Sequence, residues 1–93
     1  MGVMVHSYFA WAYIYIISTH KGDYNIGYEV SESDLFNTLS GKMGKNDHLF
    51  ELITIPHKLL KPAYNACIEF VDGRLSLSDL ETRISEMARN FEP

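Results

Sequence analysis

The sequence has a single cysteine, three prolines and no uninterrupted apolar run of membrane-spanning length. The cysteine, Cys67, cannot form an internal disulfide, so nothing indicates an oxidising compartment. The most apolar stretch, Met1 to Ile17, contains His6 and Ser7 and falls short of the roughly 20 apolar residues of a transmembrane helix. No Lys or Arg precedes the ten-residue apolar run from Tyr8 to Ile17, as one would in a signal peptide. We therefore expect a cytoplasmic protein with no membrane partner.

The sequence also lacks the motifs that carry common catalytic chemistry. It has no nucleophile elbow, no glycine-rich phosphate loop and no paired carboxylates in a recognisable context. The spacings His-x₃-His, Cys-x₂-Cys and His-Glu-x₂-His of metal sites do not occur. We therefore predict that the protein is not an enzyme and that it has no metal site and no cofactor.

Positive charge is missing from residues 22–41, which contain no Lys or Arg. This segment carries four acids: Asp23, Glu29, Glu32 and Asp34. Nucleic-acid binding needs clustered Lys and Arg, whereas the chain has a formal charge of −4 and its one weakly basic stretch, Lys42 to Lys61, has no arginine. We therefore expect a basic protein as the partner and no nucleic acid, and a nucleic-acid accessory role is the less favoured alternative.

Aromatic residues are concentrated near the N-terminus, in the stretch YFAWAYIYII from Tyr8 to Ile17. Alternation along a strand places Ala12, Ile14 and Ile16 on one face. It places aromatic side chains on the other: Phe9, Trp11, Tyr13 and Tyr15. The small and aliphatic face suits packing against helices. The aromatic face is either a recognition surface, because Tyr and Trp dominate interface hot spots, or the edge of the core.

The next elements are predicted by turn residues and helix caps. A turn-rich segment at 21–25 followed by alternation in Ile26 to Val30 predicts an antiparallel hairpin. Ser31, three residues before Asp34, predicts a helix start, and Leu35, Phe36, Leu39 and Met43 supply its apolar stripe. Residues 49–55 fit a strand or a helix, and their β-branched end before Pro56 favours a third strand.

Two helices are predicted in the remainder of the chain. Apolar residues recur at helical spacing from Leu60 to Val71, and Gly73 can take the positive φ that ends such a helix. A final helix is predicted to open at Ser78. We therefore predict an α+β fold in which residues 1–93 form a single small globular domain. An N-terminal hairpin, with the third strand at 49–55, is covered on one face by three helices, the last two of which form an αα-hairpin.

The sequence of this last hairpin, FVDGRLSLSDLETRI, resembles the helical hairpins of bacterial toxin-immunity proteins, including colicin D immunity proteins. The resemblance covers 15 of the 93 residues, from Phe70 to Ile84. It implies an inhibitor that blocks a toxin through an acidic surface, and it carries no individual functional residue across.

These observations predict a protein-binding function for the chain. We expect an immunity or antitoxin-like inhibitor that blocks a basic partner through an acidic and aromatic surface. The predicted partner-binding residues are Asp23, Glu29, Glu32, Asp34, Trp11, Tyr13 and Tyr15. The alternative from another class is a self-associating structural or regulatory domain, in which the aromatic face forms a homodimer.

Overall fold

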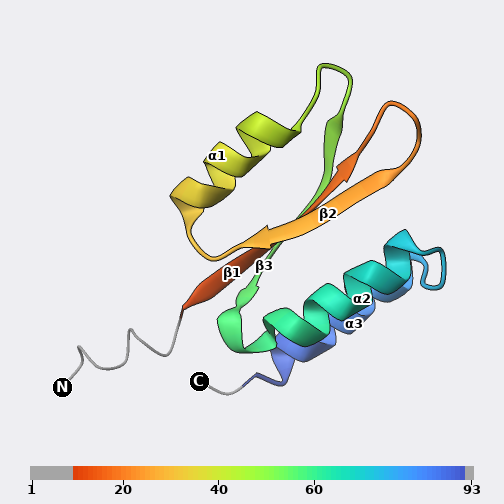
Figure 1. Ribbon diagram of the computed structural model, residues 1–93. Helices are drawn as coiled ribbons and strands as arrows, with labels where there is room; N and C mark the ends of the chain where they lie inside the picture. Colours follow the sequence, from red (N-terminus) through yellow and green to blue (C-terminus); the bar gives the residue numbers. More distant parts are fainter. Residues whose placement is uncertain (1–9, 92–93) are drawn as a thin grey trace.

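The computed structural model describes residues 10–91, which form a three-stranded antiparallel sheet and three α-helices (Figure 1). The strands are β1 (Trp11–Ser18), β2 (Tyr24–Glu29) and β3 (His48–Pro56). The helices are α1 (Glu32–Lys42), α2 (Leu60–Val71) and α3 (Leu77–Arg89), and a short 3-10 turn, η2 (His57–Leu59), precedes α2. The α+β fold, the third strand and the consecutive last two helices are confirmed.

The central strand of the sheet is β1, because the spatial order is β2-β1-β3. Both neighbours are antiparallel to β1 and therefore parallel to each other. The chain leaves β2 at one end of the sheet and must enter β3 at the opposite end, and α1 makes this return. The segment β2-α1-β3 is thus a β-α-β crossover whose two strands are separated by β1.

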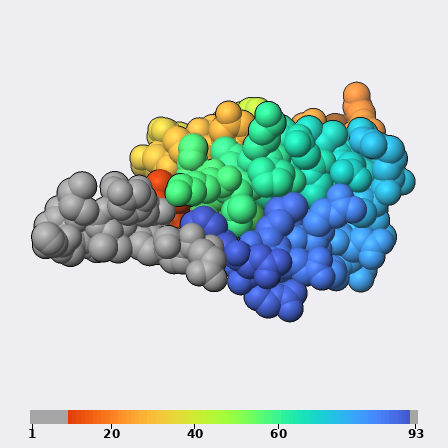
Figure 2. All heavy atoms as spheres, turned by 90° about the horizontal axis from the view of Figure 1, so that it is seen from below, coloured from red at the N-terminus to blue at the C-terminus, as the bar shows by residue number. Residues whose placement is uncertain are grey.

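The helices cover both faces of the sheet, so the expectation that all three lie on one face is wrong. On one face, Ala12, Ile14 and Ile16 pack with residues of α2 and α3. Figure 2 shows these two helices side by side over this face. On the other face, Tyr15 and Ile17 pack against the apolar side of α1 (Figure 1). The helix of the β2-α1-β3 crossover must pack against one face of the sheet, and α2 and α3 already cover the face that carries Ala12, Ile14 and Ile16.

The ends of the strands are set by hydrogen bonds, and the sequence predicts the start of β2 to within two residues. The β1–β2 turn closes at Thr19 and Asp23: the Thr19 N–H donates to the Asp23 carbonyl at 2.9 Å. The second strand therefore begins at Tyr24, two residues earlier than predicted. The first strand begins at Trp11, and Tyr8 and Phe9 lie outside the described residues.

Helix caps agree with the prediction for α1 and correct it for α3. The Ser31 hydroxyl accepts a hydrogen bond from the Asp34 N–H at 3.1 Å, as predicted. The cap of α3 is Ser76, which accepts from the Asp79 N–H at 3.0 Å, so the predicted start at Ser78 is wrong. A serine three residues before an acid occurs at both positions, and the earlier one places Leu77 inside the helix and against the core. Gly73 has the predicted positive φ, +80°.

The side chain of Tyr15 fills the space between the sheet and α1. Its exposed fraction is 2%, and the Lys42 ammonium of α1 lies 5.7 Å from the ring centroid. Gly27 is the residue opposite Tyr15 on β2. A Cβ atom at Gly27 would overlap the hydroxyl end of the Tyr15 ring. The absence of a side chain at Gly27 therefore makes room for Tyr15.

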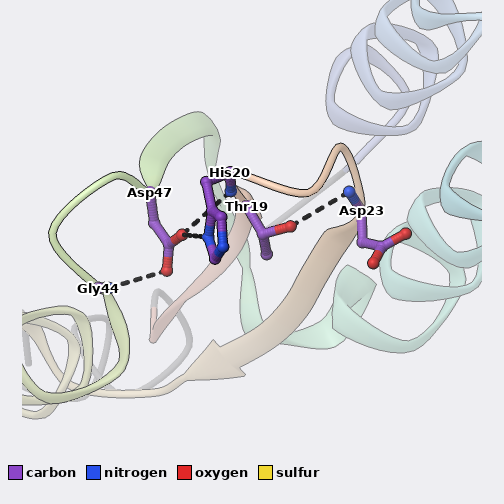
Figure 3. A network of polar contacts seen from close by, with 5 residues as sticks. All are labelled: Thr19, His20, Asp23, Gly44 and Asp47. Carbon is purple, nitrogen blue, oxygen red and sulfur yellow. Dashed lines mark hydrogen bonds and ion pairs between the residues drawn. The ribbon is translucent and has the colours of Figure 1, made fainter.

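The carboxylate of Asp47 joins the loop before β3 to the β1–β2 turn (Figure 3). The Gly44 N–H donates to Oδ2 at 2.8 Å, and the His20 N–H donates to Oδ1 at 3.3 Å. The His20 Nδ1 lies 3.7 Å from the same Oδ1. These donors, the Gly44 N–H foremost, lower the pKa of the Asp47 carboxyl.

The lowered pKa of Asp47 predicts a pH dependence for this loop contact. The folded protein stabilises the ionised carboxylate of Asp47 relative to the unfolded chain. The contribution of Asp47 to the unfolding free energy is therefore fully present above the ordinary aspartate pKa, and it is lost as the pH falls through the lowered pKa. We expect the amide resonance of Gly44 to titrate with a midpoint below the ordinary aspartate pKa, as measured by NMR. The same resonance should not titrate in that range in Asp47→Asn, and a midpoint at or above the ordinary value would contradict the contact.

The placement of Tyr15 over Gly27 predicts that Gly27→Ala is destabilising. The added methyl group must displace a buried aromatic ring, and overpacking of this kind costs roughly 1–3 kcal/mol of unfolding free energy. Gly41→Ala in α1 is the matched control, because open space surrounds that position and alanine favours a helix by about 1 kcal/mol. Urea denaturation measures both changes. Equal midpoints for Gly27→Ala and the unmodified protein would show that Tyr15 is placed elsewhere.

Candidate functional site

The face of the sheet that carries α1 is only partly covered by this helix. The Thr38 hydroxyl donates to the Glu29 carboxylate at 2.7 Å, so this side of α1 faces β2. Each helical residue turns about 100°, which places Phe36 roughly 160° from Thr38, on the side facing away from β2. Phe36 is 72% exposed, although the sequence pattern assigned it to the buried stripe. Among residues 10–91 the part of this face over β3 is therefore the less covered part, and Leu49 and Leu52 are exposed there.

Four large apolar side chains are exposed on this face. Leu52 lies opposite Tyr15 and Leu49 opposite Ile17, and residues opposite each other share a face. Trp11 belongs to the same alternating set of β1 as Tyr15. The exposed fractions of Trp11 and Leu52 are 47% and 43%. We call these four residues the apolar surface: Trp11, Phe36, Leu49 and Leu52.

Three of the predicted acids lie at the Trp11 end of the sheet. Glu29 ends β2, and it lies opposite Tyr13, which is half-buried and two residues from Trp11. Glu32 and Asp34 follow in the first turn of α1 and are exposed. Glu32, four residues before Phe36, is on the Phe36 side of α1, whereas Asp34, four residues before Thr38, is on the side that faces β2. We call Glu29, Glu32 and Asp34 the acidic border. The structure thus brings these acids, Trp11 and Tyr13 to the same end of the sheet.

Two of the predicted partner-binding residues lie apart from this group. Asp23 is in the turn at the opposite end of β2, six strand residues or about 20 Å from Glu29. Tyr15 is buried beneath α1. The sequence predicts both as partner-binding residues, Asp23 because it belongs to the acidic segment and Tyr15 because it belongs to the aromatic face of the strand. Neither pattern indicates which part of the sheet a helix covers. Neither residue belongs to the surface as the structure arranges it.

Sequence reasoning also missed three members of the apolar surface. Leu49 and Leu52 belong to a segment whose helix or strand assignment was open, so their face could not be assigned. Phe36 follows Leu35 directly, and two consecutive helical residues cannot both lie at the centre of one buried face. That adjacency was the signal that could have found Phe36.

The weakly basic stretch contributes to a separate groove of about 360 Å³. Its lining includes His57, Lys58 and Lys61 together with Tyr28 and Tyr64. The two tyrosine rings meet edge to face with centroids 5.6 Å apart. Burial raises the pKa of the Tyr64 hydroxyl, which donates to a backbone carbonyl of β2 at 3.5 Å. This hydroxyl is therefore un-ionised at neutral pH and acts as a structural donor.

The described residues offer few groups for covalent or metal chemistry. Cys67 is fully buried in α2, and this burial raises the pKa of its thiol to about 11. The thiolate that a nucleophile requires is therefore scarce at neutral pH. Within residues 10–91, no group of three His, Cys, Asp or Glu side chains has the arrangement of a metal site. No helix in the same range has both the length and the apolarity to span a membrane.

The apolar surface and the acidic border are therefore the candidate functional site. Together they offer exposed apolar side chains with negative charge at the Trp11 end of the sheet, and apolar centres with polar neighbours are found at protein-binding surfaces. Comparison with protein-family models, with curated proteins and with solved structures gives no match. The function of the chain is accordingly inferred from this surface.

Proposed function

We propose that this chain is a protein-binding inhibitor that captures a basic protein through the apolar surface and the acidic border. The observation that carries the proposal is the exposure of Trp11 and Phe36 on the face of the sheet that carries α1, with the exposed Glu32 one helical turn before Phe36. Solvent-exposed apolar patches rimmed by polar residues are typical of interaction sites.

The two parts of the surface have different physical roles in this proposal. Trp11 and Phe36 are the aromatic anchors, because aromatic side chains that become fully desolvated dominate binding energy. Glu32 and Asp34 of the acidic border are exposed, so their carboxylates accelerate the encounter with a positively charged partner and orient it. Affinity then depends on the anchors, and the association rate depends on salt.

Inhibition requires only that the bound chain cover a functional surface of its partner. A basic surface is the means by which proteins bind phosphate groups, so a basic partner that acts on nucleic acid would lose its substrate site when covered. The resemblance of the Phe70–Ile84 hairpin to toxin-immunity proteins implies the same mode of action. The alternative, a homodimer that buries the apolar surface at a twofold axis, uses the same anchors without the need for a basic partner.

The proposal predicts that each of two independent changes weakens partner binding. Phe36→Ser should weaken binding roughly 30-fold, since loss of an aromatic anchor costs about 2 kcal/mol or more, and its exposed position spares the fold. Reversing the charges of Glu32 and Asp34 to lysine should weaken binding and flatten its salt dependence. Asp23→Lys is the control for position, because it places a single reversal at the far end of β2, and it should weaken binding much less than either Glu32→Lys or Asp34→Lys alone. Affinity capture from the host at low and physiological salt, followed by titration of the captured protein, measures these effects.

The outcomes separate the proposal from its alternative. A basic partner that binds the unmodified chain and Asp23→Lys, and binds Phe36→Ser and the double reversal poorly, supports the inhibitor. Equal affinity for all four proteins would overturn it. Sedimentation of the purified chain tests the homodimer directly: a dimer that Phe36→Ser dissociates, with no basic partner captured, would replace the inhibitor by the self-associating domain.

A further inference from the structure

A second groove, of about 390 Å³, lies between β3 and α3 on the face opposite the apolar surface. Four residues of each element line it: Glu51, Leu52, Ile53 and Thr54 of β3, and Leu80, Glu81, Ile84 and Ser85 of α3. Leu80 is fully buried, and Ile53 and Ile84 are half-buried, so the floor of the groove is apolar. The groove runs beside a strand that has a free edge.

The free edge of β3 can be assigned residue by residue. Within the described residues β3 pairs only with β1. In an antiparallel ladder, the N–H and C=O of successive residues point alternately toward the neighbouring strand and away from it. The His57 N–H donates to the Ala10 carbonyl at 2.8 Å, and alternation from this pair turns the backbone of Ile53 and Ile55 toward β1. The N–H and C=O of Leu52 and Thr54 therefore point outward, at the rim of the groove.

This part of the edge has none of the devices that block strand addition. Edge strands are usually protected by lysine, by proline or by a bulge that twists the edge away. Leu52 and Thr54 are neither charged nor proline, and Pro56 lies at the end of the strand. The register shift of the β1–β3 ladder falls between Ile16 and Ile17, beyond Glu51. The segment from Leu52 to Thr54 is thus a regular and accessible template.

Carboxylates flank the apolar floor of the groove. Glu51 lines it from β3 and Glu81 from α3. Neither carboxylate has an ion pair or a side-chain hydrogen bond with any residue of the range 10–91. The groove therefore combines an apolar floor with two uncompensated negative charges and unpaired backbone groups.

We propose that this groove binds an extended, basic segment of another protein, which adds to β3 as a fourth strand. The residue of the segment opposite Ile53 would place an apolar side chain over Leu80 and Ile84, because paired residues share a face. The residue opposite Glu51 is two positions away and on the same face, where a lysine or arginine would meet Glu51 and Glu81. The segment thus carries an apolar and a basic residue two positions apart.

The charge of the groove selects this occupant over a second copy of the chain. Pairing of β3 with the β3 of another copy would bring the same glutamates into the same region, and like charges close together are destabilising. The proposal is independent of the function assigned to the apolar surface, because the groove lies on the opposite face of the sheet and shares none of its aromatic anchors.

The test uses the peptide acetyl-Thr-Lys-Thr-Val-Thr-Lys-Thr-amide, whose sequence reads the same in both directions and so fits either strand orientation. We expect saturable shifts of the Leu52 and Thr54 amide resonances when it is titrated into the full chain and followed by NMR. The matched peptide with glutamate in place of lysine should bind ~10-fold more weakly or less, because its charges repel Glu51 and Glu81.

Variants of the chain distinguish strand addition from simple charge attraction. Thr54→Pro removes an N–H that points away from β1, a change that edge strands tolerate, and should reduce binding ~10-fold, whereas Thr54→Val keeps the N–H and should bind normally. Glu81→Lys should abolish binding of the lysine peptide, and Glu86→Lys, the same change on α3 outside the groove lining, should not. If Thr54→Pro fails to fold, the comparison of Glu81→Lys with Glu86→Lys still tests the proposal.

Four results would overturn the proposal. The first is the absence of saturable shifts at Leu52 and Thr54, and the second is equal binding of the lysine and glutamate peptides. The third is a dimer of the chain, seen by sedimentation, that Thr54→Pro dissociates, since the edge would then serve a second copy. The fourth is loss of peptide binding in Phe36→Ser, because that variant changes only the other face.

Discussion

Burial of the central strand on both faces is the constraint on which the rest of this structure depends. Ile14 and Ile16 on one face and Tyr15 and Ile17 on the other are almost completely inaccessible to solvent. Removing each of the isoleucine side chains from water contributes roughly 1.5–3 kcal/mol, which is a large share of the stability of a small domain. Both faces must therefore be covered, and the helices are divided between them, with α1 on one side and α2 and α3 on the other.

This division leaves β3 as the least covered strand. A helix is about 10 Å wide and neighbouring strands are about 4.8 Å apart, so a single helix covers about two strands. Since α1 lies toward β2, the side chains of Leu49 and Leu52 on β3 stay exposed beside it. On the opposite face, two helices reach further across the sheet, but a groove remains between α3 and β3. Both candidate binding surfaces are therefore consequences of one asymmetry in how three helices cover three strands.

The sequence contains enough information for the elements and too little for their lateral arrangement. Alternation and caps place the strands and helices within a few residues, as Ser31 does for α1, because these signals act between neighbours in the chain. Tyr13 and Tyr15 belong to the same face and differ only in how completely α1 covers them, which is set by contacts between distant segments. Ser76 and Ser78 offer equivalent caps, and only the packing of Leu77 distinguishes them. The four predicted acids lie close together in the sequence, and this proximity correctly grouped Glu29, Glu32 and Asp34. It could not show that Asp23 lies at the opposite end of β2.

Negative charge lies near both surfaces, so the two proposals call for the same kind of partner. Glu32 lies one helical turn before Phe36 of the apolar surface, while Glu51 and Glu81 flank the groove. Leu52 takes part in both, because its side chain lies on the face of the apolar surface and its backbone N–H and C=O point into the edge beside the groove. A basic protein with an extended terminal segment could place a folded surface on one face and that segment along β3. The two contacts would then act as linked binding events, so the affinity of the whole would exceed that of either surface by the effective concentration that the connection provides.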